Sequence, residues 1–221
     1  MYKSGVLLFP GSNCSQDAFQ ALDLLGMNPE YIWHKEQKID SDFNFIIIPG
    51  GFSYGDYIRS GVVAVHSPII TALRNFIDQG GLVLGICNGF HILTEMGVLR
   101  GALVRNKTDR FICRYEQVEV VNSQHQWSRA FPRNNIILPI AHGDGSFFCG
   151  AEDLDYLERN NLIIFRYKNN PNGSVSNIAG IVNEDGNVLG MMPHPERVVD
   201  CLISSVVDGK YLFESIKTSL S

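Results

Sequence analysis

The chain has 221 residues, of which 45% are hydrophobic and 19% charged, a composition typical of a globular protein that forms one domain. Its formal net charge of −5 comes with scattered lysines and arginines, which argues against nucleic acid and anionic membranes as partners. Pro10 and Gly11 cut off the first apolar run before it reaches signal-peptide length, and no apolar stretch is long enough to cross a membrane, so we expect a cytoplasmic protein.

The first half of the chain alternates between short apolar runs and segments with helical periodicity. Residues 43–48 are apolar on both faces, which is typical of a central parallel strand covered by helices. Ser67 and Pro68 have the residue types of an N-cap and a first helical residue. We predict strands over residues 5–9, 31–33, 43–48 and 82–86, and helices over residues 14–25, 68–79 and 88–96. This order predicts a doubly wound α/β fold, flavodoxin-like or Rossmann-like, with a mostly parallel sheet and helices on both faces.

The second half of the chain has the pattern of antiparallel strands. Residues 111–121 alternate between apolar and polar positions, residues 162–167 form an apolar run, and residues 178–192 indicate a hairpin that turns at 184–187. Residues 204–220 favour a helix whose start is left open by an Asp-Gly pair. No linker separates the two halves, so we expect a single domain over residues 1–221.

Cys87 lies between Gly85 and Gly89, where a predicted strand runs directly into a predicted helix. This pattern is typical of a nucleophile elbow, in which the turn is so tight that glycines must flank the reactive residue. The helix N-terminus should favour the thiolate. The alternative interpretation is a small buried cysteine at a crowded turn.

Two histidines compete for the role of base. His91 follows Cys87 by one helical turn, but no neighbouring side chain is suited to hold its tautomer. His194 and Glu196 are two residues apart and are braced by Pro193 and Pro195, which suits a base and the carboxylate that orients it. The H-x-E pattern could instead hold a metal, but no second His or Cys cluster lies nearby, so we expect no metal. The residues thus favour His194.

A third loop follows the strand at 43–48 and begins with Gly50 and Gly51. A glycine pair there allows the backbone to approach a substrate and to direct N–H groups at an oxyanion, although a plain strand-ending turn is the alternative. The loops FPGSN, IPGGFSYGD and GICNG should meet at one edge of the sheet. The five cysteines are widely spaced and include no C-x-x-C pair, so we expect reduced thiols.

Several of these motifs resemble the glutaminase subunits of phosphoribosylformylglycinamidine synthase, a family of class I glutamine amidotransferases in purine biosynthesis. The resemblance spans nearly the whole chain and is carried by FPGSNC, GGFSYGD, CNGF, FICR, PIAHGDG and GMMPHPER. It implies the class I glutamine amidotransferase fold. It also implies that Cys87 is the nucleophile, that His194 is the general base and acid, and that Glu196 orients His194.

The resemblance further implies an oxyanion site formed by the backbone around Gly51, Phe52 and Asn88, and a substrate contact at position 91. The chain departs from the family in two places. His91 stands where members usually carry glutamine, and Asp144 gives HGDG where HGEG is more common.

The family hydrolyses L-glutamine and passes the ammonia to a separate ATP-dependent synthetase subunit, which amidates formylglycinamide ribonucleotide with the help of a small third subunit. The chain contains no G-x-x-x-x-G-K-[ST] phosphate loop. We therefore expect it to carry no cofactor of its own, and ATP and Mg²⁺ to belong to the partner.

Two other classes remain open. A cysteine peptidase or DJ-1-like hydrolase would share the elbow but would not need GGFSYGD or HPER. A regulatory subunit without turnover would keep the fold but would not need Cys87, His194 and Glu196 together.

Overall fold

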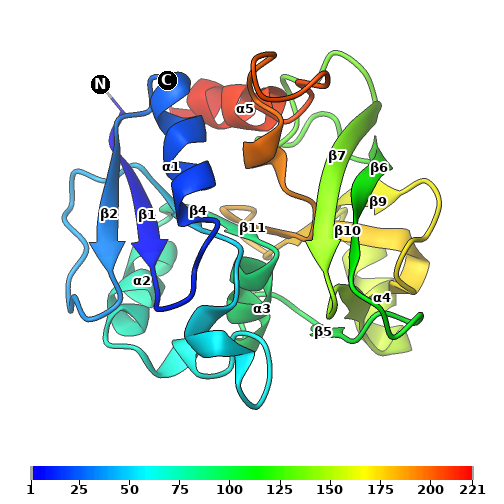
Figure 1. The fold of residues 1–221 in the computed structure, drawn as a ribbon, viewed down its shortest axis with the longest axis horizontal. Coiled ribbons are helices and arrows are strands. Elements are labelled where there is room, and N and C mark those ends of the chain that lie inside the picture. Colours follow the sequence, from blue (N-terminus) through cyan, green and yellow to red (C-terminus); the bar gives the residue numbers. More distant parts are fainter. Residues whose placement is uncertain (1, 221) are drawn as a thin grey trace.

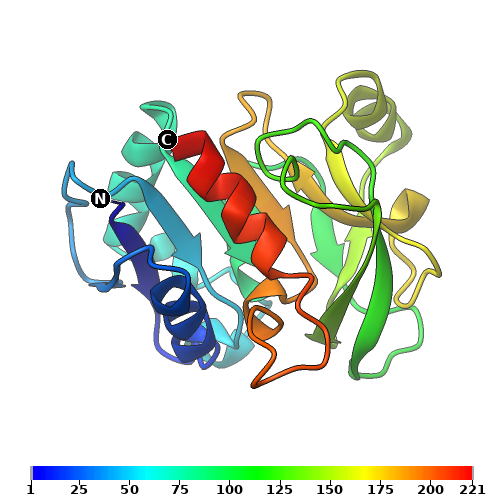
Figure 2. The same ribbon diagram turned by 90° about the horizontal axis from the view of Figure 1, so that it is seen from above.

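A computed structural model describes residues 2–220 of the chain. These residues form a nine-stranded sheet with helices on both faces, together with a small sheet of two strands (Figure 1). Helices α1 (Ser15–Leu24) and α5 (Lys210–Leu220) lie on one face, and α2 (Ile69–Asp78) and α3 (Asn88–Glu95) lie on the other (Figure 1). Figure 2 shows α1 and α5 side by side over their face. Within residues 2–220, no helix has the length and apolar character needed to span a membrane.

The large sheet joins a parallel half to an antiparallel half. Its spatial order is β2 (Pro29–Trp33), β1 (Ser4–Leu8), β3 (Phe45–Ile48), β4 (Leu82–Ile86), β11 (Val188–Met191), β10 (Ile178–Val182), β9 (Ile163–Tyr167), β6 (Ile112–Val120) and β7 (Asn135–His142). Neighbours from β2 to β11 are parallel, and neighbours from β11 to β7 are antiparallel. Strand β4 therefore lies between β3 and β11, with parallel partners on both sides.

The remaining elements are short and lie around the sheet. Strands β5 (Ala102–Val104) and β8 (Ser146–Phe148) pair with each other, and α4 (Ala151–Arg159) precedes β9. Four 3₁₀ turns complete the order: η1 (Ser53–Asp56), η2 (Ala64–His66), η3 (Val175–Asn177) and η4 (Pro195–Arg197).

The predicted fold class is confirmed, and so are the strands and helices predicted for the first half, with ends that move by a few residues. The hairpin of β10 and β11 is also confirmed. The sequence did not reveal β7, which contains Pro139. A proline is tolerated in this strand because β7 lies at the edge of the sheet. It did not reveal α4 either, in which Leu157 is the buried residue.

One helix start differs from its prediction, and the structure defines another that the sequence left open. Ser67 does not cap α2 with its side chain; Pro68 holds the cap position, and the Ser67 hydroxyl hydrogen-bonds to the Tyr54 hydroxyl at 2.8 Å. Helix α5 begins only at Lys210. Asp208 is instead engaged outside the helix, because its carboxylate accepts hydrogen bonds from Arg133 Nη2 and from the backbone N–H of Ile137, both at 2.8 Å.

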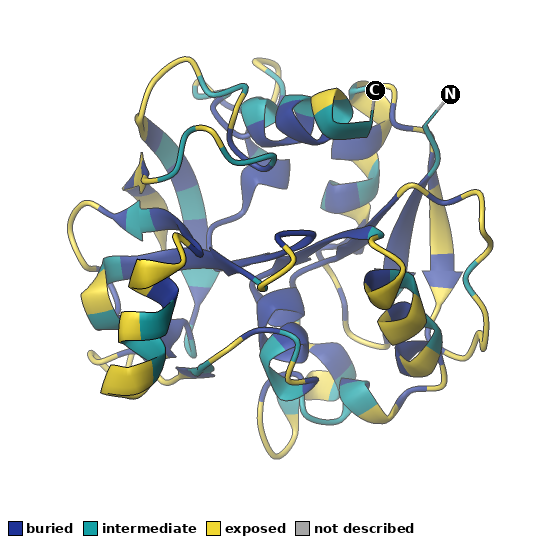
Figure 3. Ribbon diagram, turned by 180° about the vertical axis from the view of Figure 1, so that it is seen from behind, coloured by how far each residue is buried: buried dark blue, intermediate teal, exposed yellow. Residues whose placement is uncertain are grey.

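The core is centred on the strands. All residues of β3, β4, β10 and β11 are buried, and Figure 3 shows this buried sheet through the middle of the molecule with exposed residues on the outer helices and loops. Because β1, β3 and β4 are parallel, their carboxyl ends meet at one edge. The loops that follow these strands form the candidate site.

Candidate active site

A cavity of about 470 Å³ opens beside the carboxyl ends of β1, β3 and β4. The three loops that we expected to meet there do so, and the segment after β7 and the turn after β11 supply the facing wall. The residues that line the cavity include Asn13, Cys14, Gly51, Phe52, Cys87, Asn88, His91, His142, Asp144, His194 and Arg197.

The elbow between β4 and α3 is confirmed. Cys87 has φ 50°, an unusual backbone conformation for a residue with a side chain, and its N–H donates to Met191 O at 2.8 Å. A Cβ at Gly89 would lie 2.0 Å from Ile48 O, and a Cβ at Gly85 would lie 2.5 Å from Leu93 Cδ1. The two glycines therefore allow α3 to start directly above β3, with the thiol at its N-terminus.

The surroundings of the Cys87 thiol oppose its ionisation. Cys87 is 7% exposed, and its Sγ lies 3.8 Å from Ala141 O. Burial raises the pKa of the Cys87 thiol, and the nearby Cys14 and Glu196 raise it further, whereas the Asn88 N–H and Arg197 act in the opposite direction. Burial therefore opposes the effect expected of the helix N-terminus. The thiol needs a base to take its proton.

His194 and Glu196 form a buried pair beside the thiol. His194 Nδ1 donates to Glu196 Oε1 at 2.6 Å, and both side chains are 1% exposed. This contact leaves the lone pair on Nε2, which has no hydrogen-bond partner within residues 2–220. A Cβ on Gly50 would lie 2.7 Å from His194 Cε1 and 3.4 Å from Cys87 Cβ. The imidazole and the thiol-bearing side chain thus flank the same glycine.

The hydrogen bonding of His91 does not suit a base that takes the proton of Cys87. Its Nε2 donates to the Asp144 carbonyl at 2.6 Å, which links the departure at position 91 to the HGDG loop. Burial lowers the pKa of His91 to about 4. His91 is therefore neutral near pH 7, and it lines the cavity in which a substrate would lie.

The residues predicted for the oxyanion site differ in how their N–H groups are used. The Asn88 N–H is close enough to the Cys87 sulfur to lower its pKa. The Asn88 side chain accepts from Ser53 N at 3.3 Å and donates to Asp56 Oδ1 at 3.0 Å, so it anchors the GGFSYGD loop. The Phe52 N–H donates to Gly11 O at 2.9 Å, so in this structure it is engaged by another loop. Gly51, at φ 125°, lies against Asn13.

Sequence reasoning missed a buried polar residue that holds the lining residue His142. Asn106 donates to the carbonyls of Arg110 and His142 at 2.8 Å, and its Oδ1 accepts the Gly145 N–H at 3.0 Å. Oδ1 therefore also accepts from His142 Nδ1, at 3.0 Å, and the lone pair remains on His142 Nε2. That atom is buried without a partner among the described residues. Burial, with His194 and His91 nearby, lowers the pKa of His142 to about 4.

Sequence reasoning also missed Cys14 and Arg197, although both lie in motifs that it singled out. Arg197 Nη2 donates to Cys14 Sγ at 2.9 Å across a separation of 183 residues. Burial raises the pKa of Cys14 to about 11. The position of Cys14 in the FPGSNC loop was the available signal, because that loop was expected at the site.

A family model described as a CobB/CobQ-like glutamine amidotransferase domain matches residues 2–218. The chain belongs to this family. As a glutamine amidotransferase, it is an enzyme that takes the amide nitrogen of glutamine. The resemblance to glutamine amidotransferases that the motifs indicated is thus confirmed.

Solved structures agree with this assignment. A chain in the structure of PurLQS from Thermotoga maritima is 42% identical, with a TM-score of 0.91 over 100% of this chain and 99% of that one. A putative GMP synthase subunit from Thermoplasma acidophilum (14% identity, TM-score 0.69, 100% and 94% covered) and a glutamine amidotransferase from Thermotoga maritima (17%, 0.63, 99% and 84%) share the fold.

Proposed function

We propose that this glutamine amidotransferase is the glutaminase subunit of phosphoribosylformylglycinamidine synthase, with Cys87 as nucleophile, His194 as base and acid, and Glu196 as the carboxylate that orients His194. The observation that carries the proposal is the meeting of a strained elbow cysteine and a buried His–Glu pair on either side of Gly50. The 42% identity to a chain of PurLQS supports the choice of complex.

The chemistry begins with glutamine in the cavity. Because burial keeps the Cys87 thiol protonated, His194 Nε2 accepts its proton as the sulfur attacks the side-chain amide carbon. The charge that develops on His194 is stabilised by Glu196, 2.6 Å from Nδ1. The amide oxygen becomes an oxyanion. The Asn88 N–H, which interacts with the Cys87 sulfur, is a candidate donor to it, and such a donor contributes about 3 kcal/mol.

The second half of the reaction releases both products. His194 gives its proton to the amide nitrogen, the C–N bond breaks, and ammonia leaves a glutamyl thioester on Cys87. His194 then takes a proton from a water molecule that attacks the thioester, the C–S bond breaks, and His194 returns this proton to the Cys87 sulfur, which gives glutamate and the free thiol. Proton uptake and release balance over the cycle.

The partner in this proposal is a synthetase chain that binds ATP and Mg²⁺ and receives the ammonia, with a small third subunit in the same complex. In this scheme the glutaminase chain contributes no residues to the ATP chemistry and needs no cofactor of its own. The name PurLQS of the 42% identical structure supports an assembly of several chains.

The test is amidation of formylglycinamide ribonucleotide by the reconstituted complex, with glutamine or with ammonium chloride as nitrogen source. We expect Cys87→Ala to abolish the glutamine-dependent reaction and to leave the ammonia-dependent one intact. Glutamine-dependent turnover by the Cys87→Ala complex would contradict the role of Cys87. An ammonia-dependent reaction that fails even with wild-type chain would contradict the choice of synthase.

A further inference from the structure

Arg197 joins the first helix to the turn that carries His194 and Glu196, and the chemistry proposed above does not use it. Its Nη2 donates to Cys14 Sγ at 2.9 Å, and its Nε lies 3.2 Å from Asp17 Oδ2. The same Nε lies 3.8 Å from Glu196 Oε1. A guanidinium can reach three groups at once with fixed geometry, whereas a lysine ammonium presents its charge at one atom.

Glu196 needs a compensating charge. It is 2% exposed, its Oε1 accepts the hydrogen bond from His194, and its Oε2 has no partner in the described part of the chain. A buried carboxylate with so few hydrogen bonds is costly to keep ionised unless a cation lies close to it. Among residues 2–220, Arg197 is the one arginine or lysine within 4.0 Å of Glu196.

The charge of Arg197 also reaches the nucleophile. Arg197 lines the cavity together with Cys87. Glu196 raises the pKa of the Cys87 thiol, and Arg197 lowers it. The carboxylate that supports the base therefore opposes ionisation of the nucleophile, and Arg197 counteracts part of that opposition.

We propose that Arg197 is a positioning residue for the glutaminase reaction. It holds Glu196 as a carboxylate against His194 and screens that negative charge from the Cys87 sulfur, while Cys14 and Asp17 fix the guanidinium. The inference rests on the proposed function, because it assigns Arg197 a part in the same proton transfer.

The direction of the pH effect follows from the groups around the guanidinium. They are Cys14 and Asp17 at the start of α1, Cys87 at the start of α3 and Glu196 at η4, while His142 and His194 line the same cavity as Arg197. The guanidinium charge lowers the pKa of the Cys87 and Cys14 thiols, so its removal favours the protonated form of both.

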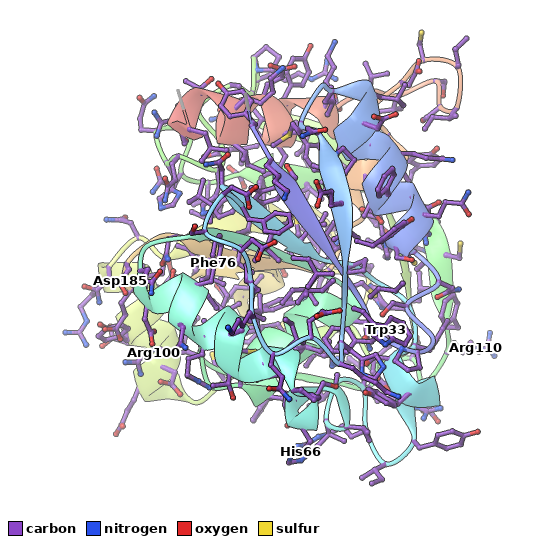
Figure 4. The ribbon with its side chains drawn as sticks, turned by 90° about the vertical axis from the view of Figure 1, so that its left-hand side faces the viewer. Trp33, His66, Phe76, Arg100, Arg110 and Asp185 are labelled. Carbon is purple, nitrogen blue, oxygen red and sulfur yellow. The ribbon has the colours of Figure 1, made fainter. Side chains whose placement is uncertain are left out.

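The experiment compares Arg197→Met and Arg197→Lys with the control Arg100→Met. Arg100 also bridges two carboxylates, Asp153 and Glu184, and it lies at the opposite side of the view from the cavity-lining Arg110 (Figure 4). Three quantities are measured: glutaminase kcat and KM against pH in the reconstituted complex, the rate of Cys87 alkylation by iodoacetamide against pH in the isolated chain, and the Tm. Peptide mass mapping separates Cys87 from Cys14.

We expect Arg197→Met to lower kcat about tenfold, to shift the acid limb of activity upward by about one pH unit, and to slow Cys87 alkylation about tenfold at a given pH. KM for glutamine should change less than about threefold, since Arg197 acts through Glu196 and Cys87. Arg197→Lys should shift both profiles by less, and Arg100→Met should leave them in place.

Other outcomes overturn the proposal. A lower Tm with unmoved pH profiles would make Arg197 purely structural, and a raised KM with unchanged kcat would make it a substrate contact. If Arg197→Met does not fold, Arg197→Lys decides, because unmoved profiles in that variant also contradict the proposal. Wild-type chain without glutaminase activity would overturn the proposed function instead, and the alkylation profile would still test Arg197.

Discussion

Gly50 is the position from which the catalytic pair can be disturbed with the fewest atoms. A Cβ there would lie 2.7 Å from His194 Cε1, whereas ordinary contact begins at 3.4 Å. Gly50 is absent from the residues with positive φ, so alanine fits its backbone and the effect of Gly50→Ala is steric. His194 is 1% exposed and tied to Glu196, and it has little room to move away.

The size of the expected effect on kcat follows from the difference between these two distances. The imidazole or the loop must shift by about 0.7 Å, the difference between these two distances. Misplacement of a reacting group by about 1 Å costs about 100-fold in rate, which corresponds to about 2.7 kcal/mol in the barrier. The extra methyl in a packed interior should also lower the free energy of unfolding by about 1–3 kcal/mol.

The assay is glutaminase kcat in the reconstituted complex, with thermal unfolding measured on the same samples. Gly150→Ala is the matched control, because Gly150 has φ −70° and a Cβ there would meet nothing within 4 Å. We expect Gly50→Ala to lower kcat about 100-fold and Gly150→Ala to leave it unchanged. A folded Gly50→Ala chain with kcat within about twofold of wild type would refute the placement of His194 as the base.

Two further predictions concern the buried histidines. His142 lines the cavity, and its buried Nε2 has no partner among the described residues. If this atom accepts a hydrogen bond from the substrate, His142→Phe should raise KM for glutamine about tenfold and change kcat little; steady-state kinetics check this, and an unchanged KM would exclude that contact. His91 binds its proton near pH 6.5 when unfolded but near pH 4 when folded, so the free energy of unfolding should fall by up to about 3 kcal/mol as the pH falls through this window. Urea titrations should show a smaller fall for His91→Gln, and an identical fall would place the acid sensitivity elsewhere.

The elbow and the His–Glu pair could be predicted because each is a local pattern. Gly85 and Gly89 are needed by the turn itself, and His194 and Glu196 are neighbours along the chain. The two segments meet because β4 and β11 are parallel neighbours, and the predicted parallel sheet indicated that the loops after its strands lie at one edge.

Contacts between distant segments could not be predicted. The pairing of Cys14 with Arg197 joins residues 183 positions apart, and the lone pair on His142 depends on Asn106, 36 positions away. The motif predicted that the Phe52 N–H donates to the oxyanion. In the structure this N–H donates to Gly11 O, a contact that depends on how the loop after β3 packs against the loop after β1. Burial of the thiol likewise depends on the complete fold, and it opposes the ionisation that the helix N-terminus favours.

The placement of β4 beside β11 has a consequence for how the enzyme loses activity. Cys87 follows β4 and His194 follows β11, and the ladder Gly85–Gly190 and Ile86–Met191 fixes their relative position. Central strands of a sheet usually open only when the whole molecule unfolds. Heat should therefore leave the nucleophile and its base aligned until the fold itself is lost, so that inactivation and amide hydrogen exchange in β4 share one temperature dependence.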